Sequence, residues 1–322
     1  MSGVTGATTH GPMTVFNLTL PELRLLREHL PGLVLPAFVP ITALRDPVDD
    51  AASPADLLAR LQSRQLVDGE ADLTEADWSQ RLPSMLLLGL SLQMTGQLVF
   101  QVQAWSGEAS GGLATTAHST TVTETVCAGL TLRSPAGADA PTVAVTVAPL
   151  SGLYPSLAEL IPADPAADTR PGIAISAGAV SLGLVESRAL IDAIRAGDER
   201  VVASLTTEFH TEGARDVLQD LSGAMGTGYR IKAFGTADTA ADRVLFSRDW
   251  YRGPRGWLKM SVTLPRPEAD SPPSSTAQAL TDTGRVTIRR TSAAGIRQDL
   301  LGLVAEILAR PGAEWNGAQN AR

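Results

Sequence analysis

Hydrophobic residues recur at helical spacing near the start of the chain. Leu23, Leu26 and Leu30 fall on one side of a helix, and Thr19-Leu-Pro-Glu22 has the capping-box pattern that begins one. These features predict a helix from Leu20 to about Leu30. Two more helical stretches are expected before the pattern changes, over residues 54–65 and from Thr74 through Trp78 and Leu82 to residue 88.

The hydrophobic period falls to two after this helical region. Between Gln97 and Trp105, apolar side chains occupy one face and three glutamines are among the residues opposite, which predicts a half-buried strand. A Gly-rich turn follows. The remaining elements expected in this half are one or two strands over Thr115–Leu132, a strand over Thr142–Val147 and a short helix over Leu153–Ile161.

The same plan repeats after a Pro-rich linker at residues 163–171. A hairpin is expected where Arg252-Gly253-Pro254-Arg255-Gly256 supplies a turn between two alternating segments. The elements expected in this half are helices over Ile191–Glu208 and Thr211–Leu221, strands over Tyr229–Phe234, Arg243–Tyr251, Gly256–Leu264 and Arg285–Arg290, and a final helix over Ala293–Arg310.

Each half therefore consists of helices, about four strands and one closing helix. Consecutive strands joined by short turns pair antiparallel. We predict an α+β fold in which two similar halves are related by a pseudo-two-fold axis, with a largely antiparallel central sheet flanked by helices. We expect a single domain over residues 14–310, with halves at 14–165 and 172–310, a disordered tail at 1–13 and a polar tail at 311–322.

Composition narrows the classes of protein to consider. The 322 residues are 44% hydrophobic and carry 26 Lys+Arg against 34 Asp+Glu, a net charge of −8. This balance argues against a broad affinity for nucleic acid or anionic membranes. There is one cysteine, no apolar run of membrane-spanning length and no secretory signal pattern, so we expect a cytoplasmic protein without membrane insertion or internal disulfides.

No motif for catalysis, cofactor binding or metal binding is evident. The four histidines have no paired spacing, and Gly223-Ala-Met-Gly226-Thr-Gly228 lacks the Lys-Ser/Thr of a phosphate-binding loop. Cys127 lies in a Thr/Val-rich strand pattern, where a buried side chain is expected more than a nucleophile. We therefore predict no catalytic, cofactor-binding or metal-binding residues, and no enzyme.

One hairpin combines residue types that are enriched at protein interfaces. Trp250, Tyr251, Arg252, Arg255 and Trp257 surround a single turn. A compatible interpretation is that the two tryptophans pack across strands and anchor the sheet while the arginines are solvated. Trp105 ends the corresponding strand of the first half, where a similar role is expected. These six residues are the predicted partner-binding site.

Taken together, five features of the chain resemble the EspG family. They are the helix at residues 20–30, the segment Leu-Leu-Ala-Arg-Leu-Gln-Ser-Arg-Gln-Leu at 57–66, the duplicated strands, the hairpin at 250–257, and the closing strand and helix at 285–308. Its members are cytosolic specificity chaperones of actinobacterial ESX (type VII) secretion systems. The resemblance covers about residues 14–310. It implies a quasi-two-fold fold with a central antiparallel sheet, and a chaperone that binds the helical tip of the PPE protein in a PE–PPE pair.

The chain departs from the family in two segments, the Pro/Ser-rich stretch at 265–278 and the long hairpin region at 106–121. Its client is therefore expected to be PE–PPE-like or another helical-hairpin ESX substrate. We expect this client to dock on the sheet and the C-terminal helices, touching the Gly-rich hairpin near Trp105, where apolar anchors and a polar rim would suffice.

Two other classes of function stay open. An enzyme with a cryptic active site predicts a deep pocket that holds polar groups with perturbed pKa values. A self-associating structural module predicts a stable homodimer with a large apolar interface.

Overall fold

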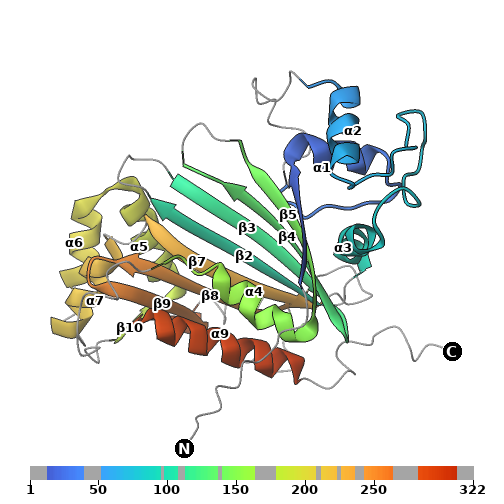
Figure 1. Ribbon diagram of the computed structural model, residues 1–322. Coiled ribbons are helices and arrows are strands. Elements are labelled where there is room, and N and C mark those ends of the chain that lie inside the picture. Colours follow the sequence, from blue (N-terminus) through green and yellow to red (C-terminus); the bar gives the residue numbers. More distant parts are fainter. Residues whose placement is uncertain are drawn as a thin grey trace, which may run out of the picture.

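The computed structural model describes residues 13–39, 52–95, 98–107, 113–136, 140–163, 179–207, 212–222, 226–235, 243–263 and 282–309. These residues contain one ten-stranded sheet in the order β1-β5-β4-β3-β2-β7-β8-β9-β10-β6 (Figure 1). Each strand pairs antiparallel with its neighbours.

The first-half elements are β1 (Thr14–Thr19), α1 (Leu20–Glu28), α2 (Pro54–Ser63), α3 (Ser84–Thr95), β2 (Leu98–Gly107), β3 (Leu113–Val122), β4 (Val126–Ser134), β5 (Thr142–Pro149), a 3-10 turn (Leu150–Gly152) and α4 (Leu153–Glu159). The second-half elements are β6 (Ala179–Gly183), α5 (Leu184–Ala196), α6 (Glu199–Thr207), α7 (Glu212–Ser222), β7 (Thr227–Gly235), β8 (Arg243–Gly253), β9 (Gly256–Thr263), β10 (Arg285–Thr291) and α9 (Ala293–Leu308).

The two halves share one topology. Among the described elements, each half has a strand, three helices, four strands and a closing helix, and the strand order is the same when read inward from either edge of the sheet. β2 and β7 meet at the centre, with Val102 opposite Ile231. The predicted α+β fold with a pseudo-two-fold arrangement is thereby confirmed. The limits of the halves stay a prediction, because residues 164–178 and both expected tails, apart from Met13, lie outside the described residues.

Both edge strands were missed by the sequence pattern. β1 and β6 bring each half to five strands, where about four were expected. They are six and five residues long and lead directly into α1 and α5. An edge strand has one neighbour and at most one buried face, so its hydrophobic signal is weak, and here a helix-start signal follows immediately.

The helix expected from Thr74 is wrong, because residues 72–83 form turns and α3 begins only at Ser84. The carboxylate of Asp72 accepts a hydrogen bond from the Thr74 N–H at 2.8 Å, and that of Asp77 accepts one from the Ser79 N–H at 2.8 Å. Such local bonds compete with a helix. Trp78 instead stacks on His29, with ring centroids 4.0 Å apart.

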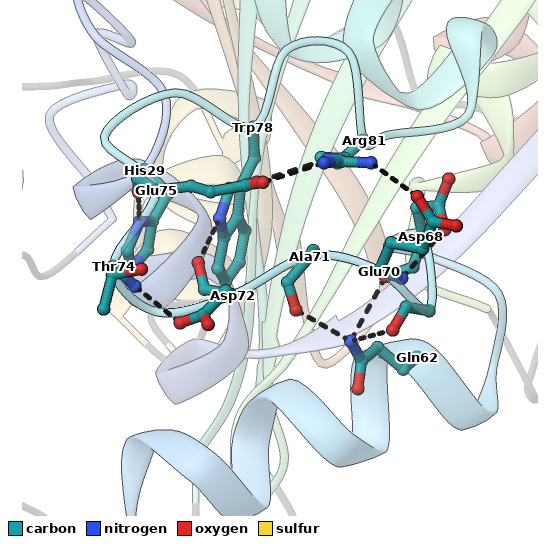
Figure 2. A network of polar contacts seen from close by, with 11 residues as sticks. His29, Gln62, Asp68, Glu70, Ala71, Asp72, Thr74, Glu75, Trp78 and Arg81 are labelled. Carbon is teal, nitrogen blue, oxygen red and sulfur yellow. Dashed lines mark hydrogen bonds and ion pairs between the residues drawn. The ribbon is translucent and has the colours of Figure 1, made fainter.

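Polar contacts hold this turn segment against the first two helices (Figure 2). Gln62 of α2 donates through Nε2 to the carbonyls of residues 68, 69 and 71 at 3.1–3.2 Å. The Arg81 guanidinium donates to both carboxylate oxygens of Glu75, at 2.8 and 3.2 Å. Trp78 Nε1 donates to the Asp72 carbonyl at 3.0 Å. The segment that leads into α3 is therefore fixed by specific bonds.

The single helix expected over Ile191–Glu208 is two helices. α5 ends at Ala196, where Gly197 adopts a left-handed φ of 67°, and α6 begins at Glu199. Glycine commonly ends helices in this way, because it lacks the Cβ that makes the conformation unfavourable. α5 also begins earlier than expected, at Leu184, where the Glu186 carboxylate accepts the Gly183 N–H at 2.8 Å.

Side-chain alternation divides the helices between the two faces of the sheet (Figure 1). α4 and α9 cover the middle of one face, above buried residues that include Phe100, Val102, Tyr229 and Ile231. α1–α3 cover one end of the opposite face and α5–α7 cover its other end, each group above its own apolar core. No helix in the described part of the chain is long and apolar enough to span a bilayer.

A histidine of β3 is buried, with its side chain directed toward β4. His118 contacts the hydroxyl of Thr131 through Nδ1 at 2.7 Å and that of Thr120 through Nε2. Gly129 makes room for it, because a Cβ there would lie 2.8 Å from His118 Cε1. Burial, aided by the nearby Arg133 charge, lowers the pKa of His118 to about 4.

We expect this histidine to make stability depend on pH. Its pKa is lower in the folded chain than in the unfolded one, so the unfolded chain takes up the proton first as pH falls. Stability is therefore full above about pH 6.5 and is lost between there and about pH 4, by about 2 kcal/mol at pH 5. Urea denaturation at pH 7.5 and pH 5 measures this loss, and His118→Gln should reduce it. Equal losses in the two proteins would contradict the prediction.

Candidate partner-binding surface

The sheet face between the two helix groups carries polar side chains at its centre. Alternate residues of the central strands point to this side, and the partly or fully exposed ones include Gln101, Gln103, Arg230, Lys232 and Asp249. We call these five residues the central polar face. The sequence indicated its glutamines as the polar side of a half-buried strand, but it gave no sign that β7 and β8 would extend the same surface.

An ion pair fixes part of the central polar face. Arg230 donates through Nε and Nη2 to the two carboxylate oxygens of Asp249, both at 2.7 Å, and the Tyr251 hydroxyl donates to Asp249 Oδ2 at 3.3 Å. Hydrogen bonding to Asp249 raises the pKa of Arg230, and burial raises the pKa of Tyr251. Lys232 has no carboxylate within 4 Å among the described residues, so it carries the unbalanced charge of this face.

Trp105 lies on the same side of the sheet and covers a glycine. Its cross-strand partner is Gly228, where a Cβ would come within 2.1 Å of the indole ring. The ring also meets Tyr251 edge-on, with centroids 5.8 Å apart. Trp105 is partly buried against the core under α5–α7. Only glycine at position 228 leaves room for this packing.

The other two predicted tryptophans lie on the opposite face. Trp250 and Trp257 are fully buried in the core beneath α4 and α9, where Trp250 packs against Tyr229 with centroids 5.6 Å apart. This burial supports the interpretation that the tryptophans anchor the sheet. Arg252 follows on that face and is partly exposed.

Arg255 lies at the turn between β8 and β9 and is tied to α7. It donates to the buried Asp220 carboxylate at 2.7 Å and to the Asp216 carbonyl at 2.7 Å. Arg290 of β10 donates to the same Asp220 carboxylate. The hydrogen bond to Asp220 is the main cause of the raised pKa of Arg255. The network fixes the hairpin turn to the helix.

The structure thus brings two of the six predicted residues together on the face between the helix groups, Trp105 and Tyr251. Trp250, Arg252 and Trp257 alternate onto the other face, and Arg255 lies at the turn. Tyr251 is itself buried. A partner-binding role for any of the six stays a prediction.

A cavity of about 640 Å³ opens among α5, α6 and α7, beyond one end of the central polar face. Both apolar and polar side chains line the cavity, so it matches a partner surface that carries both kinds of side chain. The lining residues are Ala193, Ile194, Gly197, Glu199, Val202, Ala203, Thr207, Arg215, Gln219 and Ser222.

Reactive groups are few among the described residues. Burial raises the pKa of the Cys127 thiol to about 11, so it is protonated at neutral pH and is a poor nucleophile. No three His, Cys, Asp or Glu side chains within the described ranges gather as metal ligands would.

No protein-family model matches the chain, and no curated protein is similar to it in sequence. It is similar in structure to a chain in the complex of the Mycobacterium tuberculosis type VII secretion system chaperone EspG5 with the PE25-PPE41 dimer. The TM-score is 0.53 at 9% sequence identity, over 92% of this chain and 96% of the other. The likeness extends over nearly all of both chains and shows that they share a fold.

We expect Gly228→Ala to destabilise the protein by about 1–3 kcal/mol, because the added methyl group overlaps the Trp105 ring. Urea denaturation measures the loss. In a Trp105→Ala background the same substitution should cost less than about 1 kcal/mol, since the obstructing ring is gone. Additive effects of the two substitutions would show that Trp105 does not pack on Gly228.

Proposed function

We propose that this protein is a cytoplasmic chaperone of a type VII secretion system. It binds a secreted helical-hairpin protein, PE–PPE-like or another substrate of this pathway, and keeps it soluble for export. The observation that carries the proposal is the fold likeness to the secretion chaperone over 92% of this chain and 96% of that one.

The surface suits this task better than it suits catalysis. A helical hairpin that awaits export exposes an apolar tip, and a chaperone masks such a tip with apolar contacts surrounded by polar groups. We place the client over the central polar face and α5–α7, where it would touch the β2–β3 hairpin near Trp105. The partly apolar cavity among α5–α7 supports this choice, because it offers space for protruding side chains.

The test is recovery of the client from the host cell. Tagged full-length protein is purified from the cytosol of its own organism, and the eluate is analysed by size exclusion and mass spectrometry. We expect one exported helical-hairpin protein at fixed stoichiometry, which aggregates when produced alone and stays soluble when produced with the chaperone. A monomer without such a client would contradict the proposal. A stable homodimer with a large apolar interface would favour the structural module instead.

A pair of matched variants locates the client. Gln103 is exposed on the central polar face, and Arg297 is exposed on α9 across the sheet. We expect Gln103→Arg to weaken client binding about tenfold, because it places a bulky charge inside the interface, whereas Arg297→Glu leaves the affinity unchanged. Isothermal titration of the recovered client against both variants measures the difference. Equal affinities of the two variants for the client would show that the client does not bind the central polar face.

A further inference from the structure

Helix α3 presents an apolar stripe to solvent. Its sequence, Ser84 to Thr95, contains no charged residue. Met85 and Leu88 are 38% and 36% exposed, and Leu92 is partly exposed one turn further on. The spacing i, i+3, i+7 aligns the three on one face of the helix. We call Met85, Leu88 and Leu92 the α3 stripe.

The fold does not require this stripe. α3 packs on the sheet through Leu86, Leu90 and Gly89, where a Cβ at residue 89 would lie 2.8 Å from Val145. α7 holds the corresponding place in the second half and buries its apolar residues in the same way. Its exposed side chains are polar, namely Arg215, Gln219 and Ser222. The apolar exterior of α3 is therefore not shared by α7, its counterpart in the second half.

Two residues of the stripe, Met85 and Leu92, face the centre of the sheet, and Leu88 lies above them on the side of α3 that points away from the sheet. Leu87 packs into the core that α3 shares with α1 and α2. At 100° per residue, Met85 and Leu92 lie on the opposite flank of the helix from Leu87. α1 contacts β1 and β5, whereas α3 lies over β5 and β4 and reaches β3, so this flank faces β3 and the central polar face beyond it. Figure 1 shows α1, α2 and α3 grouped at one end of the sheet.

The distance across the sheet from α3 to Lys232 matches the space that one packed helix needs. One row of paired residues runs from Val145 under Gly89, through Leu130, Ser119 and Gln101, to Lys232. Strands lie about 4.8 Å apart, and packed helices lie about 8–10 Å apart. A helix packed against α3 would therefore lie over the side chains that surround Ser119, which is itself only 3% exposed, with Lys232 about 10 Å further across on its other flank.

We propose that the α3 stripe and Lys232 form a docking site for an amphipathic helix of a partner. Apolar side chains of that helix cover the stripe, and a carboxylate on its opposite flank pairs with Lys232. The proposal deepens the proposed function, on which it rests for the identity of the partner as the client. A second copy of this chain fits less well, because α3 itself offers no carboxylate to Lys232 and each chain carries a net charge of −8.

Two designed peptides test the site. Both are helical, about 18 residues long, with leucines at i, i+3 and i+7; one carries glutamates on the opposite flank and the other lysines. Fluorescence anisotropy with the full-length protein gives their affinities. We expect the glutamate peptide to bind more tightly. Leu88→Glu should weaken it about tenfold, and Lys232→Glu should reverse the preference between the peptides.

The control is Leu301→Glu, at a leucine that is 50% exposed on α9 across the sheet, and it should change neither affinity. The absence of saturable binding, or equal weakening by Leu88→Glu and Leu301→Glu, would overturn the proposal. So would a dimer, measured by light scattering, that Leu88→Glu abolishes, because that dimer would make a second copy the occupant.

The same variants in the host purification separate this proposal from the proposed function. If Leu88→Glu weakens the peptide and also releases the client, the docking site is supported. If it weakens the peptide and wild-type protein recovers no client, the site stands and the proposed function fails. If it weakens the peptide while the client stays bound at full affinity, the client docks elsewhere and the proposal is overturned.

Discussion

The antiparallel pairing of β2 with β7 is the constraint on which the rest of the molecule depends. It runs from Leu98 opposite Gly235 to Ser106 opposite Thr227, and the Gly107 N–H donates to the Gly226 carbonyl at 2.6 Å just beyond it. Because this pairing makes one sheet from two halves, side-chain alternation stays in phase across the junction. α4 and α9 therefore share one apolar core, and the polar side chains of both halves meet on the opposite face. A slip of one residue would exchange these faces.

Among the described strands, only β1 and β6 lie at an edge of the sheet, and the same contact partly blocks both edges. The Glu22 carboxylate accepts the Thr19 N–H at 2.8 Å where β1 becomes α1, and Glu186 does the same for Gly183 where β6 becomes α5. On β1 the Arg64 side chain also donates to the Asn17 carbonyl. Exposed strand edges invite pairing with other chains, so these contacts favour a sheet that does not extend itself. Partner binding is then left to faces and helices.

The sequence predicted the elements that follow from local hydrophobic periodicity. It did not predict features that are set by contacts between residues far apart in the chain. The alternation of Leu98 to Ala104 was enough to identify a half-buried strand, and the repeated order of elements was enough to predict two similar halves. The Trp78 segment was misjudged because stacking on His29, 49 residues earlier, and bonds from aspartates outweigh its helical spacing. Five of the six candidate site residues were grouped by proximity in sequence, and Trp105 was added from the corresponding strand of the first half. Alternation places Trp250 and Tyr251 on opposite faces, and the helix that covers each face lies far away in the chain.

The pseudo-two-fold axis makes the differences between the halves informative. Since Val102 lies opposite Ile231, Gln101 corresponds to Arg230 and Gln103 to Lys232. The central polar face is thus neutral on its first-half side and charged on its second-half side. The flanking helices also differ between the halves. The first-half helix α3 exposes the apolar side chains of Met85 and Leu88, whereas its second-half counterpart α7 exposes polar side chains. A symmetric surface would accept a partner helix in two orientations of equal energy. An apolar wall on one side and a cation on the other remove that degeneracy, so a partner with one apolar and one acidic flank has a single favourable orientation. The duplicated halves provide the sheet and its flanking helices, and the residues that differ between the halves determine which orientation of a partner is favoured.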